Sequence, residues 1–182
     1  ISSLRGSGGA YIYEYVGSTL DIHSKFTSHV SGTFIELQIL TPSIDCAQFG
    51  GRSQGGESVS IYGNYAIVGA PGSNTHKGFV FVYKFNNISN QWDETQILTD
   101  DNGLSNNDDI FGDSINIHKD TIVVGNQFDT THLTYAGAVT IYKYNGYKWI
   151  KTRKLYDRTS ARVWYGGTVK VYENFIAINA YG

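Results

Sequence analysis

Gly56–Ala70 reads GESVSIYGNYAIVGA, and two later segments of this 182-residue chain repeat its pattern. The second, GDSINIHKDTIVVGN, starts at Gly112, and the third, GGTVKVYENFIAINA, starts at Gly166. The three segments align without a gap, and each has two short apolar runs joined by a polar turn. Such a segment predicts two short antiparallel strands, and its repetition predicts a fold built from copies of one unit.

Two further sets of segments complete this repeated unit. They are GFVFVYKF, GAVTIYKY and GGAYIYEY, which begin at Gly78, Gly137 and Gly8, and QWDETQIL, KWIKTRKL and TFIELQIL, which begin at Gln91, Lys148 and Thr33. One unit therefore consists of four short strands joined by turns. The 21 glycines and the 14% aromatic content also favour an all-β fold. Repeated units of four antiparallel strands are typical of the blades of a β-propeller.

The position of the repeats predicts an incomplete propeller that occupies the whole of residues 1–182. We expect strands three and four of one blade in 1–41, full blades in 55–99 and 110–156, and strands one and two of another blade in 163–182. The chain begins with Ile and contains no Met, so we expect a processed chain or a piece of a longer one. Alternatively, the two half-blades of different copies complete one another, since unpaired strand edges recruit partners.

The repeats resemble the FG-GAP repeat, which forms the blades of the integrin alpha-subunit propeller and of many bacterial, algal and protist surface proteins. Phe111-Gly112 stands at the head of one unit, Tyr165-Gly166 is its counterpart in the next, and Gly69-Ala70-Pro71 ends a second strand. The resemblance covers nearly the whole chain. Together with the missing catalytic motifs discussed below, it favours a non-enzymatic propeller, extracellular or on the cell surface, that binds a protein or glycan ligand.

Calcium is the one cofactor that the resemblance brings into question. Integrin-type blades often hold Ca²⁺ between strands one and two, but here that loop has two or three residues, such as Tyr62–Asn64, and too few carboxylates. The family's calcium role is therefore not expected there. A second candidate is a weak Ca²⁺ site in an acidic loop between blades, for which a solvated loop is the alternative. Its ligands would be Asp100, Asp101, Asn102, Asp108 and Asp109.

Composition argues against several other classes of protein. The net charge of −2 disfavours a dedicated nucleic-acid binder. The single cysteine, Cys46, allows no internal disulfide, and no apolar run approaches the length of a membrane span. The sequence contains no nucleophile elbow, and GGRSQGGES from Gly50 lacks the lysine of a phosphate loop. A hydrolase or lyase therefore ranks last among the functional hypotheses.

Ligand contacts are expected in the loops Ser73–Lys77 and Gln127–Tyr135, because loops on rigid scaffolds carry most binding residues. The candidate residues are Ser73, Asn74, His76, Asp129 and His132. Asn87-Ile88-Ser89 is a glycosylation sequon on a predicted hairpin, which makes Asn87 a candidate glycan acceptor and favours an extracellular location.

An alternative function is a structural subunit of a filament or surface layer, assembled through the open blade edges. The low charge and abundant tyrosine are compatible with it. Residues 93–120 are acidic and residues 148–162 are basic, so the two runs also permit a head-to-tail contact between copies of the chain.

Overall fold

The computed structural model describes residues 8–16, 33–46, 48–50, 58–72, 77–100, 110–157, 159 and 161–181. This part of the chain forms twelve strands and no helix, so it has no helix that could cross a membrane. The strands are β1 (Ala10–Val16), β2 (Thr33–Leu40), β3 (Val59–Tyr62), β4 (Tyr65–Ala70), β5 (Phe79–Asn86), β6 (Gln91–Leu98), β7 (Ser114–His118), β8 (Thr121–Asn126), β9 (Ala138–Tyr144), β10 (Trp149–Tyr156), β11 (Val169–Tyr172) and β12 (Phe175–Ile178).

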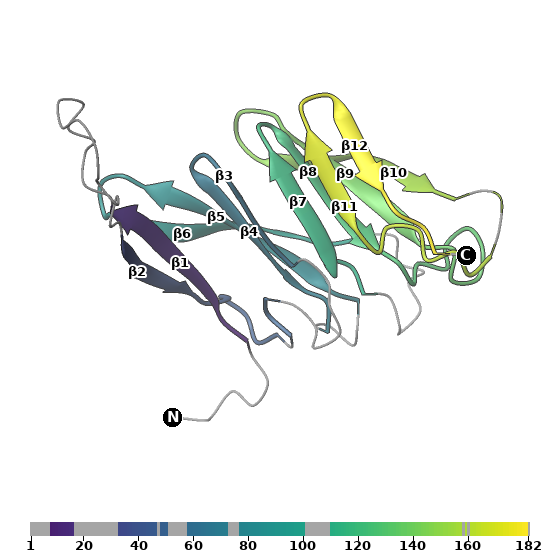
Figure 1. The fold of residues 1–182 in the computed structure, drawn as a ribbon, viewed down its shortest axis with the longest axis horizontal. Coiled ribbons are helices and arrows are strands. Elements are labelled where there is room, and N and C mark those ends of the chain that lie inside the picture. Colours follow the sequence, from purple (N-terminus) through teal and green to yellow (C-terminus); the bar gives the residue numbers. More distant parts are fainter. Residues whose placement is uncertain are drawn as a thin grey trace, which may run out of the picture.

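The twelve strands form four antiparallel sheets in chain order. Two four-stranded sheets, β3-β4-β5-β6 and β7-β8-β9-β10, lie between the two-stranded sheets β1-β2 and β11-β12. In Figure 1, β1-β2 lies at one end with the β3-β6 sheet beside it, while β11-β12 overlaps the β7-β10 sheet in this view. The all-β fold is therefore as the sequence predicted, and within each sheet the strands that pair are consecutive in the sequence, as in a meander.

The turns repeat along with the strands. In the first hairpin of three sheets, a two-residue turn begins with a residue in the left-handed backbone region: Gly63 at φ 54°, Lys119 at 53° and Glu173 at 51°. In the last hairpin of each four-stranded sheet, an asparagine side chain caps the loop. The Oδ1 atom of Asn86 accepts from the backbone N–H groups of residues 88 and 89. In the same way, the Oδ1 atom of Asn145 accepts from the backbone N–H groups of residues 147 and 148.

The core consists of the faces where consecutive sheets pack on one another. Ile67, Val80 and Val82 of the β3-β6 sheet are fully buried against Ile115 and Ile117 of the next sheet. The same strand positions are apolar in each repeat, so each sheet offers one face to its predecessor and the other to its successor. A sheet of this kind cannot bury both faces alone, and the stacking of consecutive units provides the core.

The glycines of the FG and GAP signatures meet at these junctions. A Cβ atom on Gly69 would collide with the carbonyl oxygen of Gly112 in the next unit. In the same way, a Cβ on Gly125 would collide with the carbonyl oxygen of Gly166. Gly112 and Gly166 themselves have φ of 90° and 93°, a conformation that other residues rarely adopt. The two signatures are therefore the two sides of one close backbone contact between neighbouring sheets.

Recurring hydrogen bonds also cross each junction. The Tyr83 hydroxyl donates to the Thr41 carbonyl at 2.8 Å, and the Tyr142 hydroxyl donates to the Thr99 carbonyl at the same distance. The Gln38 side chain bonds both the N–H and the carbonyl of Trp92, and Gln96 does so at Trp149. These bonds fix the relative position of sheets that are about one repeat apart in the sequence.

Candidate functional site

The most buried group of charges lies at the junction between the two four-stranded sheets. Asp100 follows β6, Lys151 and Lys154 lie on β10, and Asp129 follows β8. Lys154 Nζ is 2.5 Å from one oxygen of Asp100 and 2.6 Å from Asp129, and Lys151 Nζ is 2.8 Å from the other Asp100 oxygen. The side chains of Lys154, Asp100 and Asp129 are at least nine-tenths buried. We call these four residues the ion cluster.

The two signs of charge in the ion cluster stabilise one another. Burial alone would raise the pKa of Asp100, but Lys154 and Lys151 outweigh it and hold that pKa below its ordinary value. Burial alone would lower the pKa of Lys154, but Asp100 and Asp129 outweigh it and raise that pKa. Asp100 and Lys154 are therefore charged at neutral pH, and the ammonium of Lys154 lies between the carboxylates of Asp100 and Asp129.

Asp100, which was predicted as a calcium ligand, lies in the ion cluster. Each of its carboxylate oxygens accepts from a lysine ammonium group. The described residues contain no group of three or more His, Cys, Asp or Glu that could hold a metal ion. The other four members of the predicted site, Asp101, Asn102, Asp108 and Asp109, lie outside the described residues.

The lysines of this cluster were missed by the sequence analysis, although the alignment contains a signal for one of them. Lys154 occupies the strand position held by Ile39 and Ile97 in the other units, so a charge replaces a repeated apolar residue. Glu94 holds the strand position of Lys151 in the preceding unit and has a different partner. There, Ser43 donates to Glu94 through its backbone N–H at 2.9 Å and its hydroxyl at 2.6 Å. The side-chain chemistry of the junction therefore varies from unit to unit.

Part of the basic run that could have contacted another copy is used inside the chain, because Lys151 and Lys154 bind Asp100. Asp129 was predicted as a ligand-contact residue of its loop. It is only 1% exposed, and its second oxygen accepts from the Thr131 N–H at 2.9 Å. The loop folds back on itself, since the Gly137 N–H donates to the Asp129 carbonyl. His132 is exposed and lies beside the Tyr156 ring.

The remaining predicted residues divide between exposed and undescribed positions. Asn87 is exposed at the tip of the β5-β6 hairpin, and Ile88 within its sequon is 99% exposed. The acceptor asparagine and its sequon are thus accessible to solvent. Ser73, Asn74 and His76 lie outside the described residues.

A second candidate site is an open pocket of about 370 Å³ between the two four-stranded sheets. Tyr65, Tyr144 and Trp149 form its aromatic wall, with ring centroids 5.3 to 5.6 Å apart. Further lining residues are Lys84, Thr95, Gln96, Tyr147 and Lys148. We call it the aromatic pocket.

The chemistry of the aromatic pocket is that of a recognition site. Tyr147 is 92% exposed at its rim, and Lys84 lies 5.6 Å from the centroid of the Tyr65 ring. Burial, followed by the Tyr144 hydroxyl, raises the pKa of Tyr65 to about 12, so its hydroxyl stays protonated and can donate. Aromatic faces surrounded by a few lysine and hydroxyl donors bind ligands by stacking and hydrogen bonding.

Comparison with protein families gives one match. Residues 92–142 match the family model of the FG-GAP repeat. The matched range includes Phe111-Gly112 and Gly125, whose close contacts were described above. The chain therefore contains an FG-GAP repeat, as the sequence motifs indicated. No curated protein matches the chain.

Proposed function

We propose that the four sheets are consecutive blades of a β-propeller of the integrin-like kind. The support is the repetition of the same contacts at successive junctions: glycine against carbonyl, tyrosine hydroxyl to threonine carbonyl, and glutamine to tryptophan backbone. Recurring backbone contacts of this kind would relate each sheet to the next by a similar rotation, and radial repetition of four-stranded sheets is the architecture of a propeller. The FG-GAP match supports the same assignment.

The function that the geometry supports best is non-enzymatic binding of a glycan, with protein binding as the other form of the same adhesion role. The observation that carries it is the aromatic pocket, with three packed rings and exposed Tyr147. A pocket of about 370 Å³ suits a saccharide, whereas a stable protein interface covers roughly 800 Å² on each partner. Sugar rings stack their C–H faces on aromatic rings and use their hydroxyls for lysine and amide partners.

A glycan-binding screen of the chain tests this function. Tyr147→Ala is expected to weaken retention of the bound glycan at least about tenfold, since an exposed ring supplies much of such an interface. Tyr15→Ala is the matched control, because Tyr15 is about half exposed on a strand far from the pocket. The proposal fails if no glycan is retained, or if the two variants lose binding equally.

We place this function outside the cell or at its surface. FG-GAP repeats are typical of extracellular domains, and Asn87 is exposed and thus open to a glycosyltransferase. Mass spectrometry of the native protein is expected to find a glycan on Asn87. An unmodified Asn87 in protein isolated from its natural source would remove this support.

A structural subunit of a filament or surface layer is the second candidate. It is favoured by the exposed apolar side chains on the end strands, among them Phe34, which is 69% exposed, and Phe175, which is 78% exposed. Electron microscopy distinguishes the two functions, because a dispersed protein that binds glycan contradicts a filament.

A further inference from the structure

The aromatic pocket carries two lysines whose charge is not balanced inside the described part of the chain. Lys84 of β5 and Lys148, which directly precedes β10, both line the pocket, and its described lining contains no acidic residue. Both lysines are exposed, and neither forms an ion pair with another described residue. Asp93 lies opposite Lys84 in the β5-β6 register, but its Oδ2 atom accepts from the Asn86 amide at 2.8 Å.

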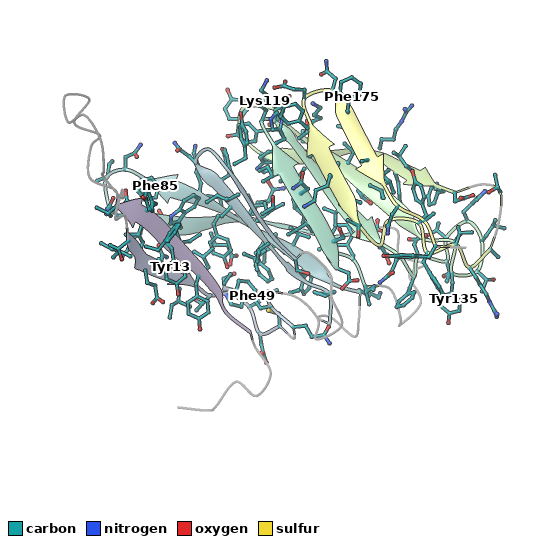
Figure 2. The ribbon with its side chains drawn as sticks, in the orientation of Figure 1. Tyr13, Phe49, Phe85, Lys119, Tyr135 and Phe175 are labelled. Carbon is teal, nitrogen blue, oxygen red and sulfur yellow. The ribbon has the colours of Figure 1, made fainter. Side chains whose placement is uncertain are left out.

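The lysine equivalent to Lys84 in the next unit is neutralised within its own sheet. Lys143 of β9 aligns with Lys84 of β5. Its Nζ atom lies 3.0 Å from a carboxylate oxygen of Asp120 and 2.6 Å from the Thr121 hydroxyl. Asp120 belongs to the turn between β7 and β8, and Figure 2 shows Lys119, the other residue of this turn, at the edge of the molecule. A turn residue of the unit thus supplies the counter-ion.

Asn64 holds the place of Asp120 in the unit that carries Lys84. Each of the two residues accepts, through its carbonyl, a backbone hydrogen bond from the residue that follows the aligned lysine. These are the bonds from the Phe85 N–H to Asn64 and from the Tyr144 N–H to Asp120, both at 2.9 Å. The amide of Asn64 carries no charge, so Lys84 lacks the counter-ion that its equivalent has.

The polar groups that remain for a ligand are mainly donors. The Oε1 atom of Gln96 accepts from the Trp149 N–H, and its Nε2 atom donates to the Trp149 carbonyl, so this amide is already bonded on both sides. A lysine ammonium donates up to three hydrogen bonds and accepts none. Lys84 and Lys148 therefore favour a ligand with negatively charged acceptors, which form stronger hydrogen bonds with an ammonium than neutral hydroxyls do.

We propose that the aromatic pocket binds an acidic saccharide, whose carboxylate or sulfate group contacts Lys84 and Lys148 while a sugar face stacks on Tyr147. This inference rests on the proposed glycan binding and specifies the class of glycan. The chain as a whole has a net charge of −2, so the attraction comes from the two local lysines rather than from the overall charge. Retention is therefore expected to weaken as ionic strength rises, because salt screens exposed charges.

Matched pairs of saccharides test the charge requirement. The probes are uronate oligosaccharides and their carboxyl-reduced forms, sialyl-lactose and lactose, and sulfated and unsulfated dextran oligosaccharides. In at least one pair, we expect the acidic member to bind about tenfold more tightly than its neutral partner at low salt, as charge-assisted hydrogen bonds predict. The pairs that show the preference identify the anion as a carboxylate or a sulfate.

Variants of the chain locate the preference at Lys84. Lys84→Met removes the charge but keeps an apolar stem over the Tyr65 ring, and it should weaken binding of the acidic probe about three- to fivefold. Asn64→Asp should weaken it similarly without changing a lining residue, because it supplies the counter-ion that Asp120 supplies to Lys143. Lys84→Arg should keep the preference. Lys143→Met is the matched control, because it removes an already paired lysine outside the pocket, and it should leave binding unchanged.

The inference and the proposed function fail under different results. Equal binding of the acidic and neutral members in every pair would overturn the inference and leave glycan binding in place. The inference also fails if Lys84→Met, shown to be folded by circular dichroism, binds the acidic probe as tightly as the native chain does. Absence of binding to every saccharide, acidic or neutral, would remove the proposed function and the inference with it.

Discussion

Replacing Lys154 with methionine is the most decisive test of how the two four-stranded sheets are held together. Methionine keeps the length and apolar stem of the side chain but removes the ammonium that lies between Asp100 and Asp129. Both carboxylates are nearly inaccessible to water, so they cannot recover by solvation the interaction that they lose. The variant should therefore be less stable than the native chain, and the loss should come from buried charge rather than from packing.

The size of the loss follows from the burial. Removing one partner of a buried ion pair typically costs about 3–5 kcal/mol, and here one ammonium serves two carboxylates. Lys151→Met is the matched control, because its side chain is 26% exposed and contacts Asp100 alone. It should cost about 1 kcal/mol or less. A third variant, Lys154→Met with Asp100→Asn and Asp129→Asn, removes all three charges and should recover most of the loss.

Urea unfolding followed by tryptophan fluorescence measures these differences in the free energy of unfolding. Their dependence on pH follows from the shifted pKa of Asp100. The lowered pKa of Asp100 means that its pairing stabilises the fold above its ordinary pKa, and that this contribution disappears as pH falls through the lowered value. In Lys154→Met, protonation of Asp100 relieves its buried charge, so the difference in stability from the native chain should narrow toward pH 4. The reasoning is refuted if Lys154→Met costs less than about 1 kcal/mol, or if the triple variant is no more stable than Lys154→Met.

Three further predictions concern the junctions and the same cluster. Gly125→Ala should lower the free energy of unfolding by more than about 2 kcal/mol, because its Cβ would collide with the Gly166 carbonyl. Gly63→Asn should cost little, since nothing lies within 4 Å of that position and Asn tolerates its positive φ. Urea unfolding compares the two variants, and equal costs would contradict the close contact. Tyr142→Phe should lower the free energy of unfolding by about 1 kcal/mol, because it removes the hydrogen bond to the Thr99 carbonyl. Tyr144→Phe should cost less, because the Tyr144 hydroxyl bonds an exposed hairpin carbonyl. The reverse order of the two losses would count against the junction bonds. The contribution of Lys154 to stability is complete below its ordinary pKa of 10.5 and should be lost as pH rises through its raised pKa. The native chain should therefore lose more stability at alkaline pH than Lys154→Met does. An equal loss in both proteins would exclude a titrating Lys154.

The strands could be predicted from the sequence because their signals are local. Alternating apolar residues and turn residues such as Asn145-Gly146 define each hairpin without reference to the rest of the chain. The ion cluster could not be predicted in this way, because Asp100 and Lys154 are 54 residues apart and meet only when two sheets pack. The burial of Asp129 could not be predicted for a related reason. Its loop position suggested exposure, but the loop folds back over the end of β10 and buries the carboxylate against Lys154.

The contrast between backbone and side-chain contacts gives the junctions two separate roles. The glycine contacts are the same at successive junctions, so they set a common geometry but cannot distinguish one sheet from another. The residues that differ sit at equivalent strand positions: Glu94 binds Ser43 at one junction, and Lys151 binds Asp100 at the next. Exchanging the two partners would place Glu94 beside the carboxylate of Asp100, with no ammonium between them. Repeats with near-identical backbones can stack in a wrong order, and a like-charge contact penalises that order. We infer that these variable pairs specify which sheet follows which, while the FG and GAP glycines specify how closely the sheets approach.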